Sequence, residues 1–204
     1  METALQNSVN ENSKKTLLKV PCVAFLFAGL IYNWILPFCW GNNPFDAHGT
    51  LSLLCEHRQP YFWLWVVLVY GGALMNLRFM YKKYDCKSKL LDAANILMII
   101  SAVAIALTLD HSIENWNPKR VIHWIVTVTL IVFLALSILI FCLKNIKKQK
   151  EFIVLTAVLI AIVGFVALWF IFLGKSAMME IIPTTMVLIL LFVVNFTPAV
   201  KKRF

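Results

Sequence analysis

The chain has 204 residues, of which 61% are hydrophobic and 14% are charged, and its formal net charge is +9. Soluble domains carry about 45–50% apolar residues, so too little polar surface remains here to keep such a domain in water. This composition excludes a soluble enzyme. The basic residues lie between the apolar runs, which argues against the one-sided basic face of a nucleic-acid-binding protein. Five cysteines without a Cys-x-x-Cys pair argue against a zinc ribbon or a disulfide-dense scaffold.

Six apolar runs are long enough to cross a membrane as helices, which takes about 20 residues each. They are Val20–Phe38, Tyr61–Leu77, Leu90–Leu109, Val121–Leu143, Phe152–Leu173 and Ala177–Phe196. The runs do not alternate apolar with polar residues, which excludes a closed β-barrel. We therefore predict an all-α, polytopic bundle of six transmembrane helices at 20–198, with a polar tail at 1–19 and a basic tail at 199–204.

The lysines and arginines predict the orientation of the bundle. Fifteen lie on the side of the termini and four on the other side, so the positive-inside rule places both termini in the cytoplasm. The first run follows a long polar tail and is not followed by a small-residue cleavage site, so we expect a retained helix. Short lysine-rich loops favour a bacterial cytoplasmic membrane. The final Lys-Lys-Arg-Phe would resemble a retrieval signal in a eukaryotic chain, which makes the endoplasmic reticulum membrane the alternative.

Aromatic and amide side chains have expected roles within this arrangement. All seven tryptophans lie in or beside the predicted outward half, as in an interfacial belt; they are Trp34, Trp40, Trp63, Trp65, Trp116, Trp124 and Trp169. Asn33, Asn76 and Asn95 are expected to form hydrogen bonds between helices. Pro183 should leave the start of the sixth helix irregular.

Histidines and several carboxylates gather on the predicted outward side of the membrane. The members are His48, His57, His111, His123, Asp46, Glu56, Asp110, Glu114 and Glu180. Imidazole and carboxylate are the ligands of a catalytic zinc ion, and His111, His123 and Asp110 could supply three of them. The alternatives are a hydrogen-bonded polar cap without metal and a haem held between spans. No His-Glu-x-x-His pattern is present, so two ligands and a base are not fixed by one helix.

Glu180 is the most informative single residue. A carboxylate about one turn inside an apolar helix is energetically costly unless it is neutral, paired with another group or in contact with water. It could act as a base or ligand together with Asp110, or it could lie at headgroup depth beside Lys175. Cys39 and Cys55 share the first outward loop, where an oxidising compartment would allow a disulfide between them.

Three stretches carry a resemblance to a known family. They are Arg-Phe-Met-Tyr-Lys-Lys-Tyr at 78–84, Asn-Pro-Lys-Arg-Val-Ile-His-Trp at 117–124 and Gly-Lys-Ser-Ala-Met-Met-Glu-Ile-Ile at 174–182. The chain resembles the Frag/DRAM/Sfk group of six-helix membrane proteins and bacterial membrane proteins near the CREST superfamily, which includes ceramidases. The resemblance implies Asp110, His123 and Glu180 as site residues and Arg78 as a cytoplasmic anchor. It also implies a compact bundle that handles or senses lipid.

Three function classes follow. The leading one is a non-transporting membrane protein whose outward polar cluster binds a lipid headgroup or a protein partner. The second is a zinc-dependent lipid amidase or esterase of the CREST type, although the chain lacks a His-x-x-x-His pair and has six spans instead of seven. The third is a small transporter, which needs polar groups through the midplane where these spans are nearly bare.

Overall fold

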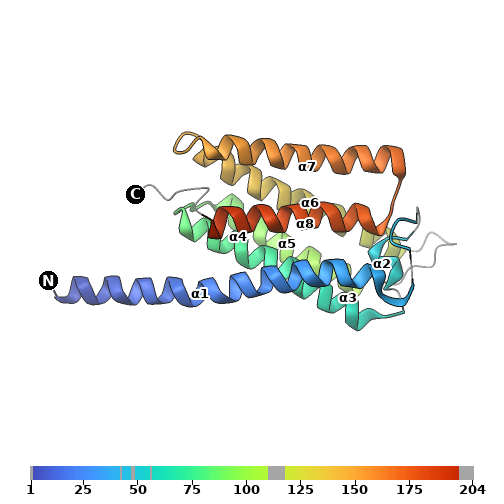
Figure 1. The fold of residues 1–204 in the computed structure, drawn as a ribbon, viewed down its shortest axis with the longest axis horizontal. Coiled ribbons are helices and arrows are strands. Elements are labelled where there is room, and N and C mark those ends of the chain that lie inside the picture. The colour runs from blue at the N-terminus through green and yellow to red at the C-terminus, as the bar shows by residue number, and fades with distance from the viewer. Residues whose placement is uncertain (1, 42, 47–48, 56, 110–117, 198–204) are drawn as a thin grey trace.

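The computed structural model describes residues 2–41, 43–46, 49–55, 57–109 and 118–197. Within these ranges the chain is helical and has no strand (Figure 1). Six helices are long and apolar enough to cross a membrane, and they run over Lys19–Cys39, Gln59–Lys83, Lys89–Leu107, Pro118–Asn145, Glu151–Leu173 and Ala177–Phe196. The predicted all-α bundle with six spans is therefore confirmed.

The first helix and the second span are both longer than the apolar runs predicted from the sequence. The elements are α1 (Glu2–Ile35), η1 (Leu36–Gly41), α2 (Leu51–Leu54), α3 (Gln59–Trp65), η2 (Val66–Gly71), α4 (Gly72–Lys83), α5 (Lys89–Leu107), α6 (Pro118–Asn145), α7 (Glu151–Leu173) and α8 (Ala177–Phe196). Since α1 begins at Glu2, the expected polar tail continues the first helix beyond the bundle (Figure 1). The second span joins α3, the π-helical η2 and α4, and it continues to Lys83, whose ammonium group donates to the carbonyls of Val194 and Asn195 near the end of α8.

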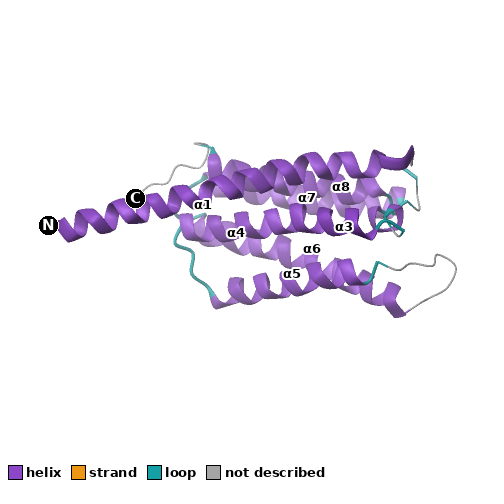
Figure 2. Ribbon diagram, turned by 90° about the horizontal axis from the view of Figure 1, so that it is seen from below, coloured by secondary structure: helices purple, strands orange, loops and turns teal. Residues whose placement is uncertain are grey.

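Successive spans lie side by side, and α8 closes the bundle against α1, α4 and α7 (Figures 1 and 2). One end of the bundle, here called the basic end, contains the α4–α5 and α6–α7 connections with Lys87, Lys147 and Lys148. The start of α2 and the α7–α8 connection lie at the opposite end. Large apolar side chains such as Ile100, Ile131 and Phe172 are exposed around the bundle, as expected for surfaces that contact lipid.

The first two spans approach each other backbone to backbone. A Cβ atom added at Gly29 would lie 2.9 Å from the carbonyl oxygen of Leu68, and one added at Gly72 would lie 3.2 Å from that of Phe25. Small residues at such positions allow the close contact that stabilises helix pairs in membranes. The two glycines therefore fix how α1 lies against η2 and α4.

Two of the three predicted asparagines form the expected bonds between helices. The Asn76 amide donates to the carbonyl of Cys22 at 3.0 Å, and the Asn195 amide donates to the Asn76 carbonyl at 3.0 Å, which joins α4 to α1 and α8. Asn33 also bonds between helices, as described below. Asn95 differs, because its Oδ1 atom is buried and has no hydrogen-bond partner among the described residues.

Candidate functional site

The carboxylate of Glu180 connects two helix N-termini at the end of the bundle opposite the basic end. Ser176 caps α8 by accepting a hydrogen bond from the amide of Met179, which places Glu180 in the first turn. Its Oε2 atom accepts a hydrogen bond from the amide of Leu51, the first residue of α2, at 3.0 Å. Negative charge is favourable at helix N-termini, where amides are unpaired and the helix dipole is positive. The carboxylate therefore binds α2 to the start of α8.

Two further contacts fasten the same region. The Met178 amide donates to the Pro44 carbonyl at 3.2 Å, and Leu54 packs on the buried cluster of Ala177, Met178 and Ile181. Pro44 and α2 are thus held on α8 by one side-chain hydrogen bond, one backbone hydrogen bond and an apolar contact. A helix of four residues such as α2 is too short to be stable alone. These contacts therefore fix its position.

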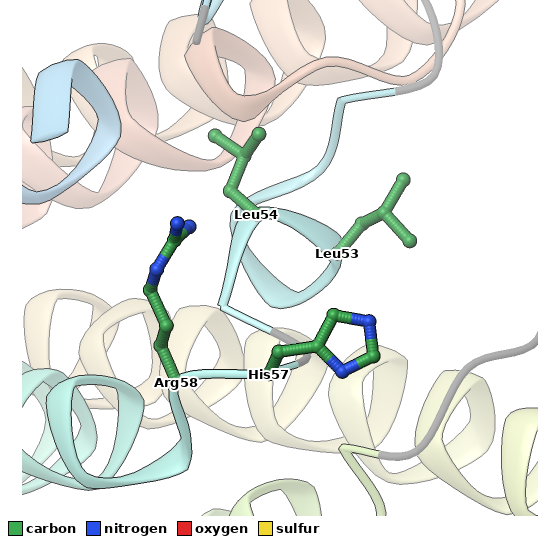
Figure 3. A pocket seen from close by; sticks show the side chains of 4 residues that line it. All are labelled: Leu53, Leu54, His57 and Arg58. Carbon is green, nitrogen blue, oxygen red and sulfur yellow. The ribbon is translucent and has the colours of Figure 1, made fainter. Parts of the chain in front are cut away.

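A hollow of about 480 Å³ lies next to α2. Leu53 and Leu54 line it from α2, and His57 and Arg58 line it from the connection to α3 (Figure 3). Its volume falls within the range of about 300–1,000 Å³ that is typical of small-ligand sites. The hollow therefore combines apolar walls with a guanidinium and an imidazole.

Beneath this region, Asn33 holds three helices together. Its amide nitrogen donates to the Ile181 carbonyl and to the Thr185 hydroxyl, both at 3.0 Å, and its Oδ1 atom accepts from the Trp65 indole at 2.9 Å. Asn33 is fully buried and Trp65 is 2% exposed. The belt interpretation is therefore wrong for Trp65, because the indole N–H is satisfied inside the bundle. Sequence reasoning missed this network, although Asn33 itself was singled out.

Two helices next to this network differ from the expectation: α8 is regular at Pro183, and the second span is irregular at η2. Helix α8 continues through Pro183 without a break, so the expected irregular start is wrong. Proline there removes only one amide, and the hydroxyl of Thr184 adds a bond to the Glu180 carbonyl at 2.5 Å. The π-helical η2 instead interrupts the second span, and such segments frequently lie at functional sites. Its buried Tyr70 packs against Trp65, with ring centroids 5.2 Å apart.

The buried thiol of Cys55 is not activated. Cys55 is fully buried, and its pKa is raised to about 12, mainly by burial; Arg58 lowers it, whereas Glu180 and Cys39 raise it. At neutral pH it stays a thiol, which excludes it as a nucleophile. The Cys39 thiol donates to the Ile35 carbonyl at 3.4 Å. Both cysteines are free in the structure, and the disulfide between them stays a prediction.

His123 lies elsewhere at the same end, between α5 and α6. Its Nδ1 atom is 3.2 Å from the Thr108 hydroxyl, which donates its own proton to the Ala104 carbonyl at 2.6 Å. When the hydroxyl donates to that carbonyl, Nδ1 is the donor to Thr108, and the lone pair of the neutral ring lies on Nε2. Because its proton is directed to a carbonyl, Thr108 is not positioned as a nucleophile for this histidine.

Several predicted site residues lie outside the described residues. They are His48, Glu56, Asp110, His111 and Glu114. Among the residues that the structure describes, no group of three or more histidines, cysteines or carboxylates could hold a metal ion; the proposed ligand set is therefore not tested, because two of its members are not described. Glu180 bonds to α2 and His123 lies against α5, so the described contacts do not bring these two predicted site residues together. Asp46 and His57 are exposed.

No family model, no curated protein and no solved structure matches the chain.

Proposed function

We propose that this six-span protein binds the polar headgroup of a membrane lipid at the hollow next to α2, without a transport cycle. The observation that carries the proposal is the bond between the Glu180 carboxylate and the Leu51 amide. This bond holds α2, whose Leu53 and Leu54 line the hollow, against the start of α8. A carboxylate retained at the edge of an apolar helix indicates a binding role when it is paired with specific groups.

The charges of the region fit a zwitterionic headgroup. Arg58 lines the hollow, and a guanidinium binds phosphate through two parallel hydrogen bonds. The Leu51 amide occupies one lone pair of the Glu180 carboxylate, which has about four acceptor sites, so others can accept from an ammonium group. Leu53 and Leu54 provide apolar contact for the part of the lipid below the headgroup. The arrangement therefore suits a phosphate and an amine that are joined by a short linker.

The middle of the bundle supports a non-transporting role. The centres of the six spans carry no Asp, Glu, Lys, Arg or His. The buried amide of Asn76 is held by carbonyls of Cys22 and Gly72, so this polar group is already satisfied within the protein. A transport path needs polar groups available to the substrate through the midplane.

Paired variants of the hollow test the proposal. Glu180→Gln keeps the side-chain size and removes the acid, Arg58→Gln removes the guanidinium, and Lys119→Gln is the control because Lys119 is exposed at the same end. Binding of a soluble short-chain phosphatidylethanolamine to purified protein is measured by calorimetry. We expect each hollow variant to bind at least about tenfold more weakly, which corresponds to about 1.4 kcal/mol. Unchanged binding by both variants would contradict the proposal, and saturable binding of a protein instead of lipid would favour the partner alternative.

A second candidate, zinc-dependent lipid hydrolysis, is supported by the orientation of His123. Its Nδ1 atom lies 3.2 Å from the Thr108 hydroxyl, and a hydrogen bond that fixes one ring nitrogen is typical of metal-binding histidines. His111 and Asp110 are the remaining proposed ligands. Metal analysis of the purified protein tests this candidate directly: stoichiometric zinc that is lost in a His123→Ala variant supports it, and absence of zinc from the wild type after purification without chelators contradicts it.

A further inference from the structure

A second hollow, of about 360 Å³, lies between α1, the second span and α5. Its walls are almost entirely apolar, and it runs along the second span from Trp63 to Arg78. At about 1.5 Å per residue these fifteen steps cover roughly 22 Å, which exceeds the roughly 15 Å of one leaflet of hydrocarbon. Val67 and Val103 line it and are 50% and 46% exposed. The hollow is therefore a groove, the α4–α5 groove, that opens sideways toward lipid.

Two polar side chains line this groove near the basic end. Arg78 lies five residues before the end of α4, and Asn95 lies six residues after the start of α5. At about 1.5 Å per residue, both lie roughly 8–9 Å inside the ends of their helices. Arg78 is exposed, whereas Asn95 is 3% exposed and its Oδ1 atom has no hydrogen-bond partner among the described residues. Near the basic end the groove is therefore lined by an exposed cation and, at about the same depth, by a buried amide whose oxygen has no partner among the described residues.

We infer that the α4–α5 groove binds one diacyl phospholipid whose headgroup carries a hydroxyl donor, with phosphatidylglycerol as the model ligand. The phosphate pairs with the Arg78 guanidinium, which suits phosphate by charge and by geometry. A headgroup hydroxyl donates to Asn95 Oδ1, which supplies the partner that a buried acceptor requires. An acyl chain lies along the apolar part of the groove. This site has no lining residue in common with the hollow next to α2, and its polar part lies toward the basic end of the bundle.

Charge and shape both favour this occupant over a protein helix. The groove is apolar along most of its length and basic at one end, which is complementary to an acyl chain with an anionic group at its head. The rest of the basic end carries further lysines, including Lys87 and Lys147, which attract anionic lipids. A transmembrane helix would need a wider apolar surface and would leave Asn95 Oδ1 without a donor.

Gly71 provides a direct test, because it lines the groove and a Cβ atom added there meets nothing within 4 Å. Its backbone is in the right-handed helical region, with φ −60°, so Gly71→Leu introduces no backbone strain and fills the groove. Gly164 on α7 also faces open space, which makes Gly164→Leu the matched control. Arg78→Gln tests phosphate recognition, with Lys82→Gln as its control because Lys82 is exposed on the same helix.

The measurement is lipid retention by native mass spectrometry. The protein is exchanged into micelles that contain phosphatidylglycerol, phosphatidylcholine or diacylglycerol with identical chains. We expect one retained phosphatidylglycerol per chain, at least about tenfold less diacylglycerol, which lacks the phosphate, and less phosphatidylcholine, which lacks a donor. Arg78→Gln should remove the preference over diacylglycerol, Asn95→Leu the preference over phosphatidylcholine, and Gly71→Leu the retention of all three.

Both controls should retain phosphatidylglycerol as the wild type does. Equal retention of the three lipids by the wild type would overturn the inference, as would normal retention by Gly71→Leu or by Arg78→Gln. If Gly71→Leu does not fold, lipid retention by Arg78→Gln still tests whether the groove binds the phosphate. Failure of the Arg58 and Glu180 variants to affect headgroup binding at the other end would leave this result unchanged, so the two proposals can fail separately.

Discussion

Replacing Asn33 by leucine should destabilise the bundle more than any other single asparagine change. Leucine has a similar size, so the substitution mainly removes polar atoms from a fully buried position. It deletes three hydrogen bonds, to Ile181, Thr185 and Trp65, at 2.9–3.0 Å. The Trp65 indole N–H would then be left buried without its present acceptor.

The size of the effect follows from these bonds. Hydrogen bonds between membrane helices contribute about 0.6 kcal/mol each on average, so three correspond to roughly 2 kcal/mol. Leaving a buried donor unpaired costs a further 1–3 kcal/mol or so. We therefore expect the free energy of unfolding to fall by about 3–5 kcal/mol, which is a large part of the stability of a protein of this size.

Unfolding by sodium dodecyl sulfate in mixed micelles, followed by circular dichroism, measures this loss. Asn145→Leu is the matched control, because Asn145 is also buried but its amide bonds to Phe141 within the same helix at 2.8 Å. It should lose about 1 kcal/mol or less. If both leucine variants unfold at the same detergent fraction, the inter-helix network does not contribute what the geometry indicates.

Three other substitutions probe charge and packing. Burial raises the pKa of Cys55 from its ordinary value of 9.0 to about 12, so the folded chain holds the thiol proton more tightly than the unfolded chain does. The stability should therefore fall as the pH rises from 9 to 12. Thermal unfolding of Cys55→Ala should show a smaller fall. Lys83→Met removes two bonds from its ammonium group to the last carbonyls of α8, at 2.7 and 2.9 Å, and should cost roughly 1.5–3 kcal/mol, whereas the same change at the exposed Lys82 should be neutral in the same detergent titration. Gly29→Ala places a Cβ atom 2.9 Å from a backbone oxygen and should markedly lower the melting temperature, while Gly164→Ala should raise it slightly because alanine favours helix by up to about 1 kcal/mol; equal effects would contradict the close approach.

The six spans could be predicted from the sequence because each needs only local information, namely an apolar run of sufficient length. The partners of Asn33 could not, because Ile181 lies 148 residues away and no local pattern specifies which helices become neighbours. Trp65 shows the same limit. Tryptophan is common at the lipid interface, which leads us to expect Trp65 there. Its burial depends on where α1 lies, and the sequence does not specify that position. Glu180 was recognisable as unusual, but its partner is a backbone amide, which every residue except proline offers.

The bonds of Asn33 also constrain the order of assembly. A chain inserted from its N-terminus delivers α1 first and α8 last, yet the Asn33 amide finds its acceptors only on α8. Trp65, on the second span to arrive, can occupy the oxygen of Asn33 early. The nitrogen must wait, in contact with water or with the insertion machinery, until α8 has been inserted. Helices α1 and α8 thus lock together only after the spans between them have been inserted, and a chain that lacks α8 would expose an unsatisfied amide that quality control can detect.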